Sequence, residues 1–310
     1  MTGRPVPRYP VYIISKGRSD CCLTARALTK DGVPFRLVVE PQERGLYAEE
    51  FGEGVLEVLP FSNLGLGSIP ARNWVWEHAK AAGAERHWIL DDNIDRFWRR
   101  WKARRFRCDS GVALRVAEDF VDRYENVAIG GLNYYMFSPN RVKQAPFFIN
   151  VHVYSCLLIR CDLPQRWRGR YNEDTDLCLQ VLSAGWCTVL INAFLAEKTP
   201  TMTMKGGNMT ELYKGDGRLK MARSLERLWP GVVETKRRFQ RPQHVVKAAW
   251  GKFDTPLRRK PGLDLSALPA TDEYGMELRQ LGEVKSPEIR QLIAGRVRPA
   301  PRAGKRAPAG

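Results

Sequence analysis

Short apolar runs alternate with amphipathic stretches along the first two thirds of the chain, and Gly or Pro residues separate many of them. The run at 11–14, for example, is followed by a polar loop and by a helical stretch that ends at Gly32. Strands that alternate with helices pair into a sheet covered by helices, so the pattern predicts an α/β fold with a mostly parallel sheet. The predicted strands are 11–14, 35–39, 55–59, 88–90, 127–129, 152–159 and 188–191, and the predicted helices are 20–32, 70–82, 110–124, capped by Ser110, and 174–184.

The composition divides the chain into two regions. With 44% hydrophobic residues and nine Trp, the larger region can bury a full-sized core. Beyond residue 255 the sequence becomes rich in Pro, Arg, Lys and Gly, and its last fifteen residues contain five basic side chains and no acidic one. We therefore expect a folded domain over 9–255 and a basic, Pro/Arg-rich, largely disordered tail over 256–310.

The cysteines and the apolar runs indicate where the protein works. No run is long enough to cross a bilayer, and the first ten residues lack the apolar stretch of a secretory signal. The cysteines are odd in number and form no CxxC pair, which argues against a disulfide framework and a structural zinc site. We expect a soluble protein of the cytoplasm, without a membrane partner, whose thiols are reduced and mostly buried; they are at 21, 22, 108, 156, 161, 178 and 187.

The charge of the chain favours a polyanionic partner. The formal net charge is +16, and the segment 96–107, RFWRRWKARRFR, interleaves seven basic residues with four aromatic ones. Basic side chains that follow a phosphate backbone, beside rings that stack on bases, are typical of nucleic-acid binding. The alternative is a half-buried hairpin or helix with its aromatic side chains in the core. On the nucleic-acid interpretation, the contact residues are Arg99, Arg100, Trp101, Arg104 and Arg105.

Candidate chemistry gathers where the predicted strands end. In open α/β sheets, ligands bind at the carboxyl ends of the strands, where the loops 15–18, 40–41, 63–69 and 91–93 all fall. The cations Lys16, Arg18 and Arg72 belong to this edge or to the helix that follows it. Cationic side chains and helix N-terminal amides suit a diphosphate.

Two acidic motifs are the candidate reactive groups. Asp91 and Asp92 end an apolar strand, and adjacent carboxylates need a positive neighbour, for which a divalent cation is the first candidate. The alternative is that they cap the next segment or pair with arginines. Glu173 and Asp174 open the helix at 174–184, where acidic residues also serve as structural caps.

The order and spacing of these motifs resemble a known family. Ala71-Arg72-Asn73, then WILDDNI at 88–94, then NEDTD at 172–176 and Gly185-Trp186 resemble GT-A glycosyltransferases. The chain looks most like the TET-associated glycosyltransferases of bacteriophages, over roughly residues 9–230. That family is linked to sugar addition on oxidised or hydroxymethylated pyrimidines in DNA. The resemblance implies a GT-A-like, Rossmann-type mixed sheet flanked by helices.

The resemblance also implies roles for individual residues. Asp92 and Asn93 would hold Mn²⁺ or Mg²⁺, although Asn93 stands where the family motif has a third Asp, which leaves open which side chain contacts the metal. Asp174 would be the general base for the acceptor hydroxyl in an inverting reaction, with Glu173 as the alternative. The residues around the nucleotide sugar would be Ser15, Lys16, Arg18, Glu40, Arg72, Asp91 and Lys205, the last in the loop 201–208.

A further metal ligand, often His, follows the helix after the acidic pair in many GT-A enzymes. No His occurs between Glu173 and Met221, and His152, inside a predicted strand, is expected to be a packed core residue. The expected function is transfer of a sugar from a UDP-sugar to a hydroxymethylated pyrimidine in DNA, with 5-hydroxymethylcytosine favoured. The alternatives are a protein or glycan acceptor, and a non-catalytic nucleic-acid-binding module on the same scaffold.

Overall fold

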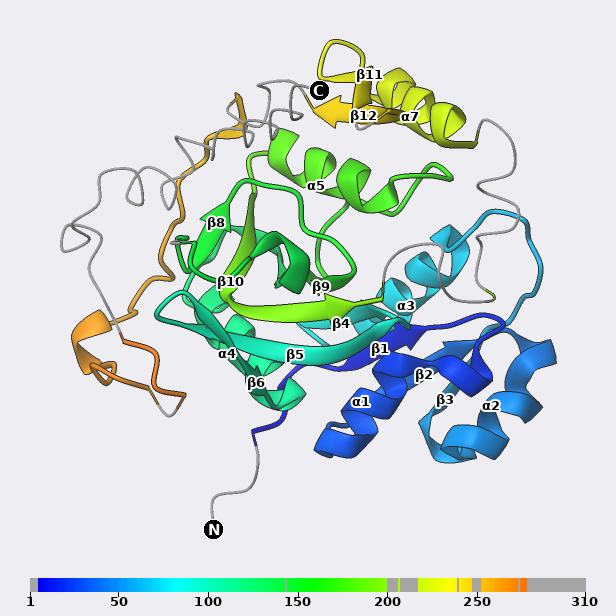
Figure 1. Cartoon of the computed structure of the whole chain (residues 1–310), viewed down its shortest axis with the longest axis horizontal. Helices are drawn as coiled ribbons and strands as arrows, with labels where there is room; N and C mark the ends of the chain where they lie inside the picture. Colours follow the sequence, from blue (N-terminus) through cyan, green and yellow to red (C-terminus); the bar gives the residue numbers. More distant parts are fainter. Residues whose placement is uncertain are drawn as a thin grey trace, which may run out of the picture.

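A mixed sheet of ten strands forms the centre of the molecule (Figure 1). The computed structural model describes residues 5–142, 144–199, 206, 217–238, 240–246, 252–272 and 274–277. Along the sheet the strand order is β3-β2-β1-β4-β9-β7-β10-β5-β6, and β8 pairs with β10. The strands are β1 (Val11–Ile14), β2 (Arg36–Val39), β3 (Leu56–Val58), β4 (Arg86–Asp91), β5 (Ile94–Trp101), β6 (Arg104–Cys108), β7 (Val127–Tyr134), β8 (Phe147–Ile149), β9 (Cys156–Arg160) and β10 (Cys187–Lys198).

The sheet is mixed rather than mostly parallel. Strands β1 to β4 pair in parallel, as the alternating pattern predicted, but β9 lies antiparallel between β4 and β7. Parallel neighbours need a crossover connection, usually a helix. The described part of the chain between β7 and β9 contains β8 and no α-helix, so β9 returns in the opposite direction.

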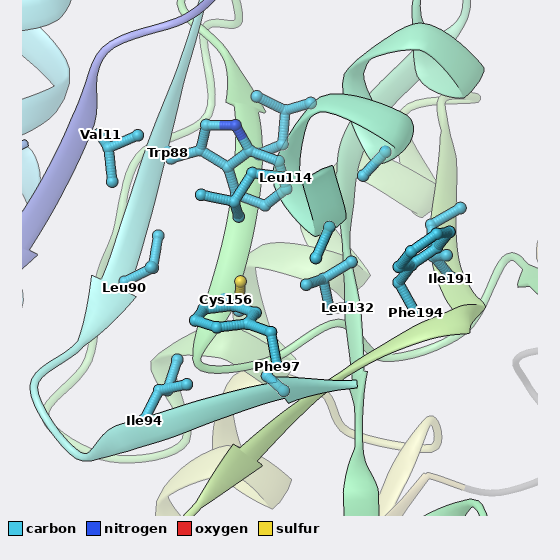
Figure 2. Close-up of a cluster of buried hydrophobic side chains, with 14 of the residues drawn as sticks. Val11, Trp88, Leu90, Ile94, Phe97, Leu114, Leu132, Cys156, Ile191 and Phe194 are labelled. Atoms are coloured by element: carbon cyan, nitrogen blue, oxygen red, sulfur yellow. The ribbon is translucent and has the colours of Figure 1, made fainter. Parts of the chain in front are cut away.

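Helices cover both faces of the sheet, as the α/β pattern predicted. Alternate strand residues face opposite sides, so Trp88 and Leu90 join one buried cluster while Ile89, between them, joins the other. Figure 2 shows Trp88 beside Leu114 of α4, with Leu90 further along β4. The first cluster includes side chains of α1 (Leu23–Asp31), α2 (Arg44–Phe51) and α4 (Ser110–Val121), and the second those of α3 (Ile69–Ala81), α5 (Glu173–Ser183) and α7 (Gly217–Leu228).

A small hairpin completes the second face. Strands β11 (Val233–Arg238) and β12 (Arg241–Val246) pair with each other and lie beside α7 and α5 (Figure 1). Asn172 Nδ2, at the start of α5, donates to the carbonyl oxygen of Met221 in α7 at 2.9 Å. Neither this hairpin nor α7 was among the predicted elements.

The ends of two predicted elements differ from the structure for local reasons. Asp109, not Ser110, caps α4, because its carboxylate accepts from the amide of Gly111 at 2.8 Å. The hydroxyl of Ser110 donates instead to Asp31 at 2.6 Å. The strand predicted at 152–159 begins only at Cys156, because a positive φ angle at Ser155 interrupts the extended chain.

The basic and aromatic segment at 96–107 forms a hairpin. Strands β5 and β6 pair antiparallel from Phe97–Cys108 to Trp101–Arg104. Lys102 and Ala103 connect them with φ angles of 46° and 59°, the left-handed conformation of a two-residue hairpin turn. Phe97 is buried in the core, as the hairpin alternative expected for aromatic side chains of this segment.

The predicted tail begins within a segment that lies against the domain. The amide of Arg258 donates to Asn126 Oδ1 at 2.8 Å, and Asn150 Nδ2 donates to the carbonyl oxygen of Thr255 at 2.8 Å. Tyr274 is 8% exposed and belongs to the first core cluster. The packed part of the chain therefore continues past residue 255 to 277, and residues 278–310 lie outside the described residues.

Two further expectations concern the thiols and the membrane. All seven cysteines are free, and five of them are buried. Within the described ranges, no helix combines the length and the apolar character that crossing a membrane requires.

Gly131 in β7 tests how closely the strands must approach. A Cβ atom at this position would lie 2.3 Å from the carbonyl oxygen of Cys156, a backbone atom of the neighbouring strand. We predict that Gly131→Ala lowers the free energy of unfolding by about 1–3 kcal/mol or more, measured by urea denaturation. In the control Gly45→Ala, an exposed position of α2 with nothing within 4 Å, stability should rise by about 0.4–1 kcal/mol. Equal effects of the two substitutions would contradict this packing.

Candidate active site

The four polar loops predicted to meet at one edge of the sheet do meet there. Lys16, after β1, forms an ion pair with Glu40, after β2, at 2.8 Å and donates to Asn63 Oδ1 at 2.9 Å. The amide of Asn63 also donates to Glu40. These contacts lower the pKa of Glu40 against the opposing effect of burial. The ends of β1, β2 and β3 thus share one polar network.

Asp92 belongs to the same edge and is nearly enclosed. Arg18 Nη1 lies 2.5 Å from Asp92 Oδ1, and the hydroxyl of Ser15 donates to Asp92 Oδ2 at 2.7 Å. The side chains of Arg18 and Asp92 are 9% and 7% exposed. Burial raises the pKa of Asp92, and Arg18 opposes that rise. The negative charge of Asp92 therefore depends on its ion pair with Arg18.

Asp91 faces a different set of partners. Arg72 Nη2 lies 3.0 Å from its Oδ1, while Lys198 Nζ and the hydroxyl of Ser155 contact its Oδ2 at 2.8 and 2.6 Å. Burial alone would raise the pKa of Asp91, but Lys198 and Arg72 hold it below its ordinary value. Asp91 and Asp92 therefore each pair with an arginine, which is the alternative that the sequence left open for them.

Arg72 joins the two acidic motifs into one site. Its Nη2 contacts Asp91, its Nε lies 3.5 Å from Glu173 Oε1, and the guanidinium stacks on Trp167 at 4.7 Å from the ring centroid. The hydroxyl of Ser68 also donates to Glu173, at 3.0 Å. Glu173 is eighty-two residues after Asp91 in the chain, yet one buried side chain contacts both.

The two carboxylates of the second motif differ in basicity. Burial raises the pKa of Glu173, and Asp174 raises it further, while Arg72 lowers it. Burial also acts on Asp174, but His152 and Arg72 hold the pKa of this group well below its usual range. Asp174 does not cap α5 as expected, because the N-cap position is Asn172, in the left-handed conformation.

His152 lies in the site rather than in the core. Its Nε2 is 3.3 Å from Asp174 Oδ2 and 3.2 Å from the hydroxyl of Thr175, and its side chain is 30% exposed. The expectation of a packed core residue is wrong because the strand that was to contain it begins only at Cys156. Its ring also lies edge-on to that of Tyr154 at 4.9 Å.

Sequence reasoning missed the residues that surround Asp91 from the far strands. Lys198 ends β10 and contacts Tyr134 of β7 as well as Ser155. Burial raises the pKa of Tyr134 to about 12, so its hydroxyl stays protonated beside this cation. The available signal was a lysine at the end of a mostly apolar run, but its partner could be named only with the sheet order known.

The oxygen donors of the 91–93 turn fit a divalent cation only in part. Asn93 is 8% exposed, and its Oδ1 is buried without a hydrogen-bond partner, as suits an oxygen ligand. Both oxygens of Asp92 are occupied by Arg18 and Ser15. Within the described residues, no group of three or more His, Cys, Asp or Glu side chains is arranged around a metal position. Of the described residues in this turn, Asp92 and Asn93 thus offer at most two ligands, a number that Mg²⁺ sites in nucleotide enzymes commonly use.

Lys205, predicted to bind the nucleotide sugar, lies outside the described residues. Its neighbour Gly206 is described and reaches the first loop, where its carbonyl oxygen accepts from Arg18 Nη2 at 3.2 Å. A Cβ at Gly206 would lie 2.1 Å from the carbonyl oxygen of Gly17, so the backbones meet closely here. Gly206 therefore lies directly against the 15–18 loop.

The residues predicted to bind DNA divide into two groups on the hairpin β5–β6. Trp101 is 44% exposed, and Arg104 is exposed beside it. The other three bind oxygens of the protein itself: Arg99 binds the carbonyl of Gly275 at 2.8 Å, Arg100 binds Gln144 Oε1 at 2.9 Å, and Arg105 binds the carbonyl of Tyr135 at 2.9 Å.

The comparison with known proteins identifies the family. The family model of the TET-associated glycosyltransferases matches residues 9–207, more than half of the chain, so the protein belongs to that family and is a glycosyltransferase. A structure from Desulfovibrio desulfuricans G20, described as a nucleotide-diphospho-sugar transferase, is similar at 9% identity with a TM-score of 0.38, over 62% of this chain and 82% of that chain. A search of curated proteins finds no match.

Removing the side chain that bridges the motifs should be costly. We predict that Arg72→Ala lowers the free energy of unfolding by about 3–5 kcal/mol, because it removes the buried cation that Asp91 and Glu173 share. Arg72→Lys should recover only part of this loss, since an ammonium lacks the forked geometry that reaches both carboxylates. Urea denaturation measures both effects.

Arg26→Ala is the matched control. Arg26 pairs with Glu50 on the surface, where the two side chains are 50% and 40% exposed, so its loss should cost about 0–1 kcal/mol. A loss for Arg72→Ala as small as that for Arg26→Ala would show that the bridge does not hold the motifs together.

Proposed function

We propose that this glycosyltransferase moves a sugar from a UDP-sugar to the hydroxymethyl group of a modified pyrimidine in DNA, with 5-hydroxymethylcytosine favoured. The observation that carries the proposal is the contact of Arg72 with both Asp91 and Glu173, which joins a candidate donor site to a candidate base. Family membership supplies the reaction class. The net charge of +16 supports a polyanionic acceptor.

The donor side is proposed to lie over the ends of β1, β2 and β4. Ligands of open α/β sheets bind at this edge. Arg18, Arg72 and Lys16 are cations that can exchange a carboxylate partner for a diphosphate oxygen, and forked guanidinium groups suit phosphate well. The proposed donor residues are Ser15, Lys16, Arg18, Glu40, Arg72, Asp91 and Lys205.

Asn93 and Asp92 are the residues that would hold Mn²⁺ or Mg²⁺. The support is the buried, unpartnered oxygen of Asn93 and the oxygen chemistry of its neighbour. When bound, such an ion neutralises charge on the departing diphosphate. Because Asp92 is already paired with Arg18, that arginine must leave the carboxylate for Asp92 to become a ligand.

Glu173 is the better of the two proposed bases. An alcohol is activated by a carboxylate within reach whose pKa is not depressed. Burial raises the pKa of Glu173, whereas the neighbouring His152 lowers that of Asp174. Asp174 is then proposed to orient His152 and the start of α5. Asp174 was the first choice of base from the sequence, with Glu173 as the alternative, and the contacts of the two groups favour Glu173.

A protein or glycan acceptor is the second candidate, with a non-catalytic module as the third. We expect purified protein, UDP-sugars, Mn²⁺ and DNA containing 5-hydroxymethylcytosine to yield a nucleoside heavier by one hexose or N-acetylhexosamine, read by mass spectrometry. EDTA should suppress the product if the ion is required. Product on a protein or glycan, with none on DNA, would support the second candidate instead.

Two substitutions locate the reaction in this assay: Asp91→Asn is the test, and Asp162→Asn is its control. Asp91 contacts Arg72 and Lys198 in the site, whereas Asp162 pairs with Arg160 on the surface, with 62% of its side chain exposed. We expect the first substitution to abolish transfer and the second to leave it near the wild-type rate. Equal activity of the two variants would place the reaction elsewhere.

The two acidic residues are separated by their kinetics. We predict that Glu173→Gln lowers kcat by about 10²–10⁴-fold with little change in the donor KM, and that Asp174→Asn has the smaller effect. Because the base must be ionised and burial raises the pKa of Glu173, activity should fall with acidification at a pH above the ordinary glutamate value of about 4.3. The larger loss in Asp174→Asn would return the role of base to Asp174.

A further inference from the structure

The hairpin β5–β6 presents two aromatic rings on one face. Cross-strand partners in an antiparallel pair share a face, and so do residues two positions apart. Trp101 pairs with Arg104, and Arg99 pairs with Phe106, so these four side chains belong to the same face of the hairpin. Trp101 and Phe106 are diagonal neighbours there, with Arg99 and Arg104 at the other corners.

Both rings are open to solvent. Trp101 is 44% exposed and Phe106 is 48% exposed, although large aromatic side chains are usually buried. β6 ends the order of the sheet, and within the described residues no further strand pairs with its outer side. Two open rings at the edge of a sheet are a costly arrangement unless a partner covers them.

Cations frame this pair of rings. The guanidinium of Arg99 lies 5.5 Å from the Trp101 ring centroid, and the ammonium of Lys102 lies 5.6 Å from it. Arg104 and Lys102 are exposed. The surface formed by Trp101, Lys102, Arg104 and Phe106, here named the hairpin platform, therefore combines apolar rings with positive charge, which complements a polyanion that also carries flat apolar groups.

A hollow of about 350 Å³ adjoins the platform. Trp101 and Lys102 line it together with Gln144 and Asn192. The Gln144 oxygen accepts from Arg100, and the Asn192 amide donates to the carbonyl of Ala145 at 3.0 Å, so both amides are engaged within the protein. The hollow thus offers the indole of Trp101 as a wall and space beside it. It offers few groups that could distinguish one base from another.

We propose that the hairpin platform binds unpaired nucleotides, so that the acceptor is recognised as single-stranded or locally opened DNA rather than as intact duplex. Bases stack on exposed rings only when they have left the double helix, whereas a duplex presents phosphates. Trp101 and Phe106 stack on successive bases, Lys102 and Arg104 contact the phosphates, and one base enters the hollow. The preference among bases is weak.

The platform also lies at a useful distance from the active site. β5 begins directly after Asn93, and its eight residues span about 23 Å. We expect a DNA strand that is bound to Trp101 and Phe106 to continue along β5 toward Asp91 and Glu173. This inference deepens the proposed function and rests on it only for the identity of the acceptor, because binding to the platform requires no transfer.

The test is fluorescence anisotropy with a labelled thymidine oligonucleotide about 16 nucleotides long, the upper end of the site sizes known for such surfaces. A duplex of the same length is the comparison. We expect the single strand to bind more tightly, and Trp101→Ala and Phe106→Ala each to weaken it roughly 5- to 100-fold. Trp101→Phe should retain most of the affinity, since a ring remains.

Salt dependence separates the rings from the cations. Lys102→Ala with Arg104→Ala should reduce the slope of log affinity against log salt by about 1.4, or about 0.7 for each lost phosphate contact, whereas Trp101→Ala should leave the slope unchanged. The matched controls are Lys80→Ala on α3 and Leu46→Ala on α2, both exposed residues of other elements. Neither should change affinity or slope.

Duplex binding as tight as single-strand binding, together with no effect of Trp101→Ala or Phe106→Ala, would overturn the proposal. Thermal denaturation of each variant shows whether the fold is retained, and Trp101→Leu provides a second variant that keeps an apolar side chain without the aromatic ring. Ring-dependent binding without any transfer would sink the proposed function alone. Transfer to DNA without ring dependence would sink only the present inference.

Discussion

The buried guanidinium of Arg72 is the constraint on which the rest of the site depends. It is 8% exposed, contacts Asp91 and Glu173, and stacks on Trp167. A charge removed from water to this extent requires partners in good geometry, and a carboxylate beside it requires the charge in return. Arg72 therefore fixes the end of β4 against the start of α5, and with them the only two acidic motifs that the sequence analysis selected as reactive groups.

The balance of charge around Arg72 limits what the site can bind. Three cations form ion pairs with three carboxylates. A diphosphate that enters must therefore take cations from their present carboxylate partners or bring a cation with it. The Arg18–Asp92 pair is the natural point of exchange, since Asn93 next to it has a buried oxygen without a partner. The three cations are Arg18, Arg72 and Lys198, and the three carboxylates are Asp91, Asp92 and Glu173.

Much of this arrangement follows from the sequence, because strand ends in an open α/β sheet share an edge. The loops that hold Lys16, Glu40 and Asp92 were grouped by that rule, and the structure pairs Lys16 with Glu40 and the neighbouring Ser15 with Asp92. The contributions of β7, β9 and β10 could not be anticipated in the same way. Lys198 reaches Asp91 because β10 pairs with β5 in a register that places Lys198 opposite Ile94, just after the 91–93 turn, and strand order is a long-range property that local patterns do not encode. His152 was misplaced because Ser155, in the left-handed conformation, interrupts the predicted strand, so that β9 begins only at Cys156.

Both acidic motifs are proposed to serve one reaction, the first at the donor and the second at the acceptor hydroxyl, and a crystal structure of the protein with a UDP-sugar tests this most directly. We predict that the diphosphate lies between the 15–18 loop and Arg72, with Arg18 withdrawn from Asp92 and the sugar facing Glu173. A nucleotide bound away from this edge of the sheet, with the contacts of Arg18 and Arg72 unchanged, would contradict it.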